Sequence, residues 1–246
     1  MALKVTRNHK NGFGGRSPWK PIFLTIGAVL VSQLLVAAVL IVYMLARHIQ
    51  ITESGLTGFE IQLSMAAEVI FGLLAFWFIR RGKLTVRAAT PTVKWVLIIL
   101  ASVVVLQVFG TLAATLTSQL FHLGTPADDI LVRSVVAHHR SELILLGVYI
   151  VILAPVCEEL LFRGYLFNSL FKENGGRWGF WASAVVSGMV FALAHMEIVE
   201  FIPLTVVGIF LAWLFHKNNN NIVVNIITHA LVNLSALVLS LVALGK

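Results

Sequence analysis

The sequence has little charge and almost no cysteine. Charged residues make up 12% of its 246 residues, about half the share found in an average soluble domain, whereas hydrophobic residues make up 59%. Water therefore cannot be the main solvent of this chain, and a soluble globular domain is excluded. The single cysteine, Cys157, excludes an intramolecular disulfide. Because it lies in an apolar run, we interpret it as a small core residue rather than a catalytic thiol.

Motifs for nucleotides and structural zinc are also missing. The sequence has no phosphate-binding loop, no dinucleotide fingerprint and no paired zinc-binding cysteines. The formal net charge is +7, but the lysines and arginines lie between apolar runs instead of forming one patch. That pattern is typical of membrane topology. We therefore expect no nucleic acid among the partners.

Long apolar runs are what the sequence does contain. Several of them approach the ~20 residues that cross a bilayer as a helix. They predict an all-α, polytopic transmembrane bundle of about seven spans, with six to eight possible. The expected spans are 21–46, 60–79, 93–121, 142–168, 178–196, 199–216 and 222–244. The fifth and sixth are joined only by a turn near Met196 to Val199, so a re-entrant pair is an alternative there.

The distribution of lysine and arginine predicts the orientation. With a cytoplasmic N-terminus, thirteen of them fall on cytoplasmic segments and four on outer segments, and Arg163 lies within a span. The positive-inside rule therefore favours a cytoplasmic N-terminus and an outer C-terminus. We expect a multi-pass protein of a bacterial cell membrane, surrounded by membrane lipids. In the outer loop 122–141, apolar residues recur every three or four positions and predict a short surface helix, with His138 and His139 solvated.

Polar side chains are concentrated in the later spans, although a charge inside a bilayer is costly. Glu159 and Arg163 are four residues apart, acid first, which favours an ion pair on one helix face. Glu158 is rotated by about 140° from Arg163 and so is left for other chemistry. Pro155 interrupts the backbone hydrogen bonding just before the acids and favours a kink that admits water. A carboxylate in such a place is a suitable general base.

Two further pairs with the same spacing follow. Phe191 and His195 are four residues apart, as are His229 and Asn233, so each pair lies on one stripe of its helix. Each histidine alone is more often a packing residue, but together with the acids they predict a site. If the helices are straight, His195 and Glu158 lie at different depths in the membrane. His195 would lie about 25 Å from Trp178, towards the outer face, unless the span 142–168 extends into the cytoplasm or the span 178–196 is tilted or broken.

These patterns resemble the CAAX protease and bacteriocin-processing family (CPBP, or Abi) of intramembrane glutamic proteases. The family pattern is Glu-Glu-x-x-x-Arg, then Phe-x-x-x-His, then His-x-x-x-Asn. Here it reads, in order, Glu158-Glu159-x-x-x-Arg163, Phe191-x-x-x-His195 and His229-x-x-x-Asn233. The resemblance covers about residues 142–244. It implies a catalytic core there, after a basic cytoplasmic tail over 1–20 and anchoring spans over 21–121, in a single membrane domain.

The resemblance also implies roles and a reaction. Glu158 would be the general base for water, His195 would assist it, and His229 with Asn233 would stabilise the oxyanion. Glu159, Arg163 and Phe191 would support the site. The reaction would hydrolyse a peptide bond of a hydrophobic, lipidated or membrane-associated peptide or protein, with no metal or other cofactor.

Three alternatives stay open at this point. Two histidines and a carboxylate could hold zinc in a membrane metalloprotease, although no His-Glu-x-x-His occurs. A membrane carrier could use the ionisable residues, with Glu68, as a relay. A bacteriocin immunity protein or scaffold could use them for helix packing alone. The sequence leaves the substrate, the cleavage site and the oligomeric state undetermined.

Overall fold

The computed structural model describes residues 19–47, 58–122, 132, 135–136 and 142–244. The elements are α1 (Trp19–Arg47), α2 (Gly58–Gly82), α3 (Val93–Phe121), α5 (Leu143–Val148), η2 (Tyr149–Leu153), α6 (Ala154–Glu158), η3 (Glu159–Phe167), α7 (Asn168–Asn174), α8 (Gly176–Ala194), α9 (Phe201–Lys217) and α10 (Ile222–Leu244). The elements from α5 to α7 follow one another without a break and form one long helix. In the described part of the chain, every predicted span corresponds to a helix, so the all-α polytopic prediction is confirmed.

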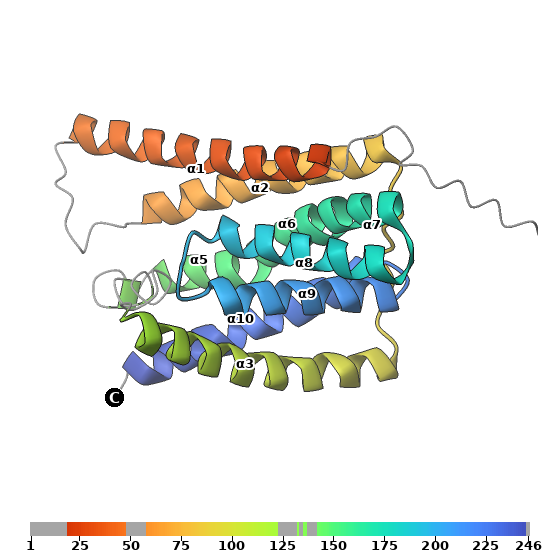
Figure 1. The fold of residues 1–246 in the computed structure, drawn as a ribbon. Coiled ribbons are helices and arrows are strands. Elements are labelled where there is room, and N and C mark those ends of the chain that lie inside the picture. The colour runs from red at the N-terminus through yellow and green to blue at the C-terminus, as the bar shows by residue number, and fades with distance from the viewer. Residues whose placement is uncertain (1–18, 48–57, 123–131, 133–134, 137–141, 245–246) are drawn as a thin grey trace, which may run out of the picture.

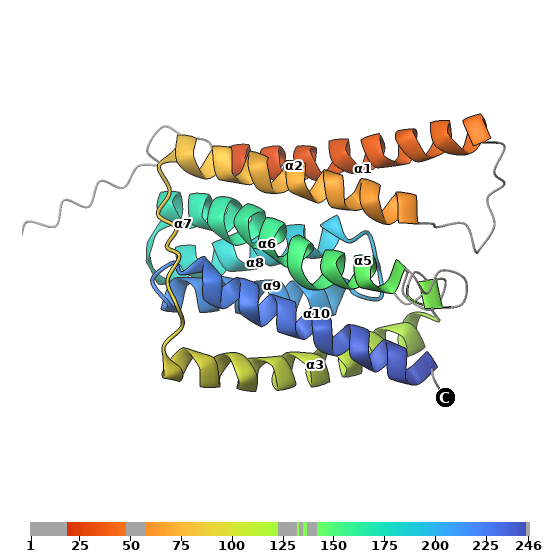
Figure 2. The ribbon, with the colours of Figure 1, turned by 180° about the vertical axis from the view of Figure 1, so that it is seen from behind.

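The helices form a bundle with the later ones inside. In Figures 1 and 2, α1 and α2 cover one side and α3 the opposite side, while α5 to α9 lie between them and α10 crosses beside α3. Six described helices are long and apolar enough to cross a membrane, and α9 is shorter, with 17 residues. Large apolar side chains point outwards, such as Leu34 and Leu73, which are 69% and 65% exposed. An outer surface of this kind suits lipid as the solvent.

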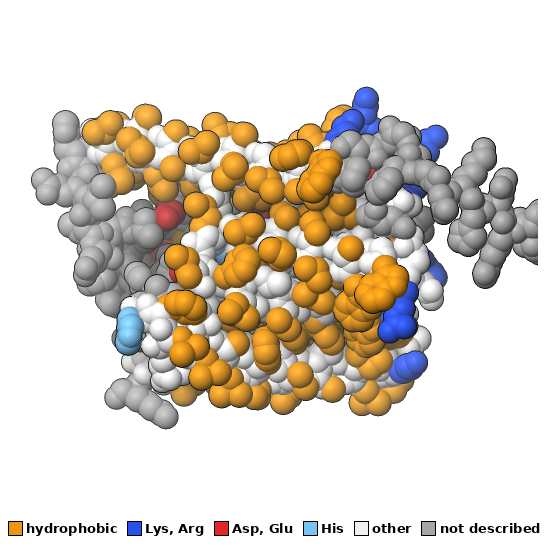
Figure 3. Space-filling model, in the orientation of Figure 1, with side chains coloured by type: hydrophobic (Ala, Val, Ile, Leu, Met, Phe, Trp, Pro, Cys, Tyr) orange, Lys and Arg blue, Asp and Glu red, His pale blue; other side chains and the backbone are white. Residues whose placement is uncertain are grey.

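Lysine and arginine side chains gather at one end of the bundle. Figure 3 shows them at the end where α1 begins and α2 ends. The orientation of this end towards the cytoplasm stays a prediction, as does the division into anchoring and catalytic parts. Residues 1–18, which include most of the predicted basic tail, lie outside the described residues.

The asparagine tract after α9 forms a turn that fixes the start of α10. Asn219 and Asn220 both have positive φ, 52° and 59°. The turn is tied to the segment after α2, because Arg87 N–H donates to Asn220 O at 2.8 Å and Ile222 N–H donates to Arg87 O at 2.9 Å. The Asn221 side chain adds two bonds with the backbone of Ala89. These bonds hold α10 at a defined depth beside the acids.

The structure describes four positions of the outer loop, His122, Val132, Val135 and Val136. Val132 and Val135 are buried and pack against Ile61 and Leu146. Apolar residues of this loop thus cover one end of the bundle. The rest of the predicted surface helix, with His138 and His139, lies outside the described residues.

Helices α8 and α9 approach each other through two glycines. A Cβ on Gly188 would lie 2.7 Å from the Thr205 carbonyl oxygen, and one on Gly208 would lie 2.6 Å from the Gly188 Cα. Small residues at such a crossing let helix backbones approach closely inside membranes. This contact matters for the site because α8 carries Phe191, and His195 directly follows the last residue of α8.

We therefore predict that Gly208→Ala destabilises the protein, because the added methyl group forces α8 and α9 apart. The expected cost is about 1–3 kcal/mol of unfolding free energy. Thermal unfolding of the purified protein in detergent measures it. Gly110→Ala is the matched control, since a Cβ on Gly110 meets nothing within 4 Å. Equal melting temperatures for the two variants would contradict the close α8–α9 contact.

Candidate active site

The helix that carries the acids is wider than an α-helix on both sides of them. The π-helical turns η2 and η3 flank α6, which contains Pro155 and ends at Glu158. Such π turns are frequent at functional sites. The kink at Pro155 stays a prediction, and the structure has π turns before and after α6 in a continuous helix.

Asn233 supplies a donor where the proline cannot. Pro155 has no N–H, so in the π register, in which residue i donates to residue i−5, the Ile150 carbonyl lacks its backbone donor. The Asn233 side-chain amide donates to Ile150 O at 2.9 Å. This bond joins α10 to η2, which precedes the acids in the same long helix.

Glu159 is completely buried and its two oxygens have three partners. Its Oε1 lies 2.9 Å from Arg163 Nη1 and 3.0 Å from His229 Nδ1. Its Oε2 accepts a hydrogen bond from Asn225 Nδ2 at 3.0 Å. Glu159 and Arg163 are both 0% exposed. The ion pair predicted from their spacing is therefore present, and Glu159 is held by groups that favour its charged form.

Arg163 is supported by two neighbouring helices. Its guanidinium carbon lies 4.5 Å from the centre of the Phe191 ring, a cation–π contact from α8. Its Nη2 donates to Gly208 O on α9 at 3.4 Å. Phe191 is itself fully buried. The phenylalanine of the Phe-x-x-x-His pattern thus supports the cation that pairs with Glu159.

Glu158 lies in a different environment from its neighbour. Its side chain is 16% exposed, and Oε2 lies 3.6 Å from His229 Nε2. Among the described residues, this oxygen has no hydrogen-bond partner. The carboxylate lines a cavity of about 470 Å³. The acid that the helix-face argument left unpaired is therefore the one that faces space for a ligand.

His229 bridges the two acids. Its Nδ1 faces Glu159 Oε1, which can only accept when Glu159 is ionised, so Nδ1 carries a hydrogen. In a neutral ring Nε2 would then hold a lone pair facing Glu158. The 3.6 Å approach is favourable only if a proton lies between them, on Nε2 or on the Glu158 carboxyl group. The arrangement can thus hold a proton beside Glu158.

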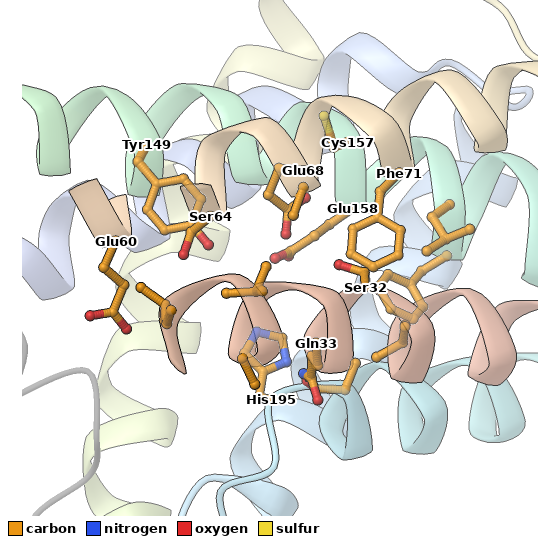
Figure 4. Close-up of a pocket in the computed structure, with 18 residues that line it drawn as sticks. Ser32, Gln33, Glu60, Ser64, Glu68, Phe71, Tyr149, Cys157, Glu158 and His195 are labelled. Atoms are coloured by element: carbon orange, nitrogen blue, oxygen red, sulfur yellow. The ribbon is translucent and has the colours of Figure 1, made fainter. Parts of the chain in front are cut away.

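His195 lines the same cavity as Glu158, as Figure 4 shows. Its Nδ1 lies 2.8 Å from Phe191 O, and because a carbonyl only accepts, Nδ1 is the donor. In the neutral ring Nε2 is then the basic nitrogen. The Phe191 ring contacts both imidazoles, with centroids 4.7 Å from His195 and 5.8 Å from His229.

The difference in membrane depth that straight helices predicted between His195 and Glu158 does not occur. The helix that carries the acids does not stop at residue 168 but continues to Asn174, one residue before α8 begins at Gly176. Glu158 lies 16 residues before that turn and His195 lies 19 residues after it. At 1.5 Å per residue these are similar distances, about 24 and 28 Å. The two side chains therefore line the same cavity without a break in α8.

The structure does not bring all predicted residues to the cavity wall. His229 contacts Glu158, and Asn233 donates to Ile150 O. Neither residue is among those that line the cavity. Within the described residues, no three His, Cys, Asp or Glu side chains converge as a metal site.

Sequence reasoning missed Asn225 and Gln33, and it named Glu68 as part of a carrier's relay. Asn225 is four residues before His229, so an Asn-x-x-x-His-x-x-x-Asn stripe on α10 could have indicated it. Glu68 on α2 lines the cavity beside Glu158, and its Oε2 also has no hydrogen-bond partner in the described chain. Gln33 on α1 lines it too and donates to Ala194 O at 2.9 Å. The first two helices therefore help to form the cavity, although they carry no motif.

A known protein family matches the part of the chain that contains these residues. Residues 140–235 match a family described as "Type II CAAX prenyl endopeptidase Rce1-like". This range contains all three motifs. The resemblance to the CPBP family is thus confirmed. This part of the chain is therefore similar to CAAX prenyl endopeptidases.

A curated relative adds a bacterial example. The UPF0177 protein YxdF of Lactococcus lactis subsp. lactis (strain IL1403) is 32% identical over 84 residues. The alignment covers 34% of this chain and 43% of that protein, so it spans less than half the length of the relative. No solved structure matches the chain.

The buried ion pair gives a first prediction for the residues around the acids. Arg163→Leu should cost about 3–5 kcal/mol of unfolding free energy, because it leaves Glu159 charged and buried without its cation. The double variant Glu159→Gln, Arg163→Leu should recover part of that loss, since no uncompensated charge remains. Thermal unfolding in detergent of wild type, Glu159→Gln, Arg163→Leu and the double variant gives the coupling energy. Additive effects of the two substitutions would contradict the pairing.

The bond from Asn233 to Ile150 gives a second prediction. Asn233→Ala should lower the unfolding free energy by about 0.5–1.5 kcal/mol, because the half-buried Ile150 carbonyl loses its donor. Adding Pro155→Ala should restore part of the loss, since residue 155 then has an N–H of its own. The measurement is again thermal unfolding. If Pro155→Ala shifts the wild type and Asn233→Ala by the same amount, the two residues do not share this role.

Proposed function

We propose that the chain is an intramembrane endopeptidase in which Glu158 and His195 activate a water molecule without a metal. The observation that carries the proposal is the unequal treatment of two adjacent acids. Glu159 is saturated by Arg163, Asn225 and His229, whereas Glu158 faces the cavity beside His195. Two acids kept in different environments are a common way to divide the tasks of acid–base catalysis.

The proposed first step is the attack of water on the scissile carbonyl carbon. Glu158 takes a proton from the water, with the basic Nε2 of His195 oriented towards the same cavity as a second acceptor. The water oxygen forms a bond to the carbonyl carbon, and the carbonyl π electrons move to its oxygen. A positioned base of this kind contributes about 10²–10⁴-fold to rate.

The proposed second step is the collapse of the tetrahedral intermediate. His229 in its doubly protonated form, with Nδ1–H held by Glu159, donates from Nε2–H to the oxyanion. We assign a supporting donor role to Asn233, whose amide has two hydrogens, one of which is directed to Ile150 O. When the C–N bond breaks, the proton held by Glu158 goes to the leaving amine. Glu158 thus acts first as base and then as acid.

The cavity supports a hydrophobic substrate. Apart from its carboxylates it is lined largely by apolar side chains of α1, α2 and the helix of the acids, among them Val36, Leu40, Phe71 and Phe162. A volume of about 470 Å³ accommodates a few residues of an extended peptide. We therefore propose membrane-associated peptides or protein segments as substrates, lipidated or not.

The test compares Glu158→Gln with wild type on a panel of quenched hydrophobic peptides in detergent. We expect kcat to fall by about 10²–10⁴-fold, because the amide cannot accept the proton of water. Glu142→Gln is the matched control, since Glu142 directly precedes the same apolar span and does not line the cavity. It should keep wild-type activity.

A chelator arm separates this proposal from the zinc alternative. Hydrolysis by wild type should be unchanged by a strong chelator. Loss of activity that zinc restores would instead support a metalloprotease. Retention of more than a tenth of the activity by a folded Glu158→Gln protein would contradict the proposed base.

A further inference from the structure

A second cavity lies away from the acids, at the basic end of the bundle. Its volume is about 880 Å³, in the range of ligand sites. It is formed by the start of α1, the end of α2 and the segment from η3 to α7, and its lining shares no residue with the cavity of Glu158. Neither the proposed reaction nor the family motifs use it.

Three cations stand around this cavity. Lys20, Arg81 and Lys172 line it, against one acid, Glu173. Two of the three are held in place. Lys172 Nζ donates to the carbonyls of Gly82 at 3.2 Å and Lys83 at 3.5 Å, and Arg81 lies over the Trp77 ring at 5.2 Å. The cavity therefore has a net positive rim.

The inner wall is apolar and aromatic. Tyr165 is buried and stacks on Phe78, with ring centroids 4.8 Å apart. Leu24 and Leu84 are half-buried beside them, and Trp77 is half exposed towards the surroundings of the bundle. Trp19, at the start of α1, is also exposed, and exposed tryptophans at the ends of spans are typical of the membrane–water interface. The wall thus suits a hydrocarbon chain and the rim suits an anion.

We propose that this cavity binds an anionic phospholipid, with the phosphate headgroup at Lys20, Arg81 and Lys172 and an acyl chain along Phe78 and Trp77. Basic pockets between transmembrane helices bind such headgroups, and anionic lipids attract clustered Lys and Arg. The tail 1–18 is a poor occupant, because its own ionisable side chains are lysines, arginines and a histidine, which the rim repels. A zwitterionic lipid would gain less from the positive rim.

Native mass spectrometry of the full chain in neutral detergent tests this. The protein is incubated with an equimolar mixture of phosphatidylglycerol and phosphatidylcholine that have the same acyl chains. We expect selective retention of phosphatidylglycerol. Arg81→Gln with Lys172→Gln should weaken it by at least about tenfold. Lys94→Gln with Arg177→Gln removes the same charge outside the cavity and should change retention by less than about twofold.

Further arms decide what is recognised. Lys172 also donates to two backbone carbonyls, so its substitution removes those bonds as well. The single variant Arg81→Gln is therefore measured beside the double variant, with a melting temperature for each. Weaker retention by Arg81→Gln at an unchanged melting temperature supports the site. Three outcomes overturn it: equal retention of both lipids by wild type, equal losses in the two double variants, or displacement of phosphatidylglycerol by millimolar inorganic phosphate, which would make a free phosphate the ligand.

Discussion

A charged carboxylate deep in a helix bundle must be compensated, because no water is at hand to solvate it. Glu159 satisfies this requirement with partners from two elements, Arg163 in η3 and the stripe of Asn225 and His229 on α10. Arg163 in turn contacts Phe191 of α8 and the Gly208 carbonyl of α9. One buried ion pair therefore connects four helical elements, η3, α8, α9 and α10. Its geometry decides which way the neighbouring Glu158 points.

Two adjacent acids acquire different chemistry from that connection. A helix turns by about 100° per residue, so Glu158 does not share the Arg163 and Asn225 contacts of Glu159. It faces a cavity instead, together with His195 from the end of α8 and Glu68 from α2. His229 contacts both acids through its two nitrogens, so a single imidazole lies between them. Structural support and acid–base chemistry thus share the same side chains.

The sequence predicted the parts of the protein that depend on local periodicity. Span positions, the Glu159–Arg163 pair and the stripe of Phe191 and His195 follow from hydrophobic length and the spacing of four. The end of the acid-bearing helix was predicted too early, at 168, because KENGGR reads as a loop while the helix continues to Asn174. The π turns and the bond from Asn233 to Ile150 depend on tertiary contacts around Pro155, which no periodicity encodes. The roles of Glu68 and Gln33 depend on how α1 and α2 pack, and lone polar residues in a span do not reveal that.

The central claim is that Glu158 is accessible from the cavity while Glu159 is locked in its ion pair. Reaction of the folded wild-type protein with a hydrophobic carbodiimide, followed by fragmentation mass spectrometry of the peptide that contains both acids, measures this directly. The account predicts that the adduct forms on Glu158, that Glu159 stays unmodified, and that hydrolysis is lost in proportion to the Glu158 adduct. An adduct on Glu159 with Glu158 unmodified, or full activity with Glu158 completely modified, would contradict it.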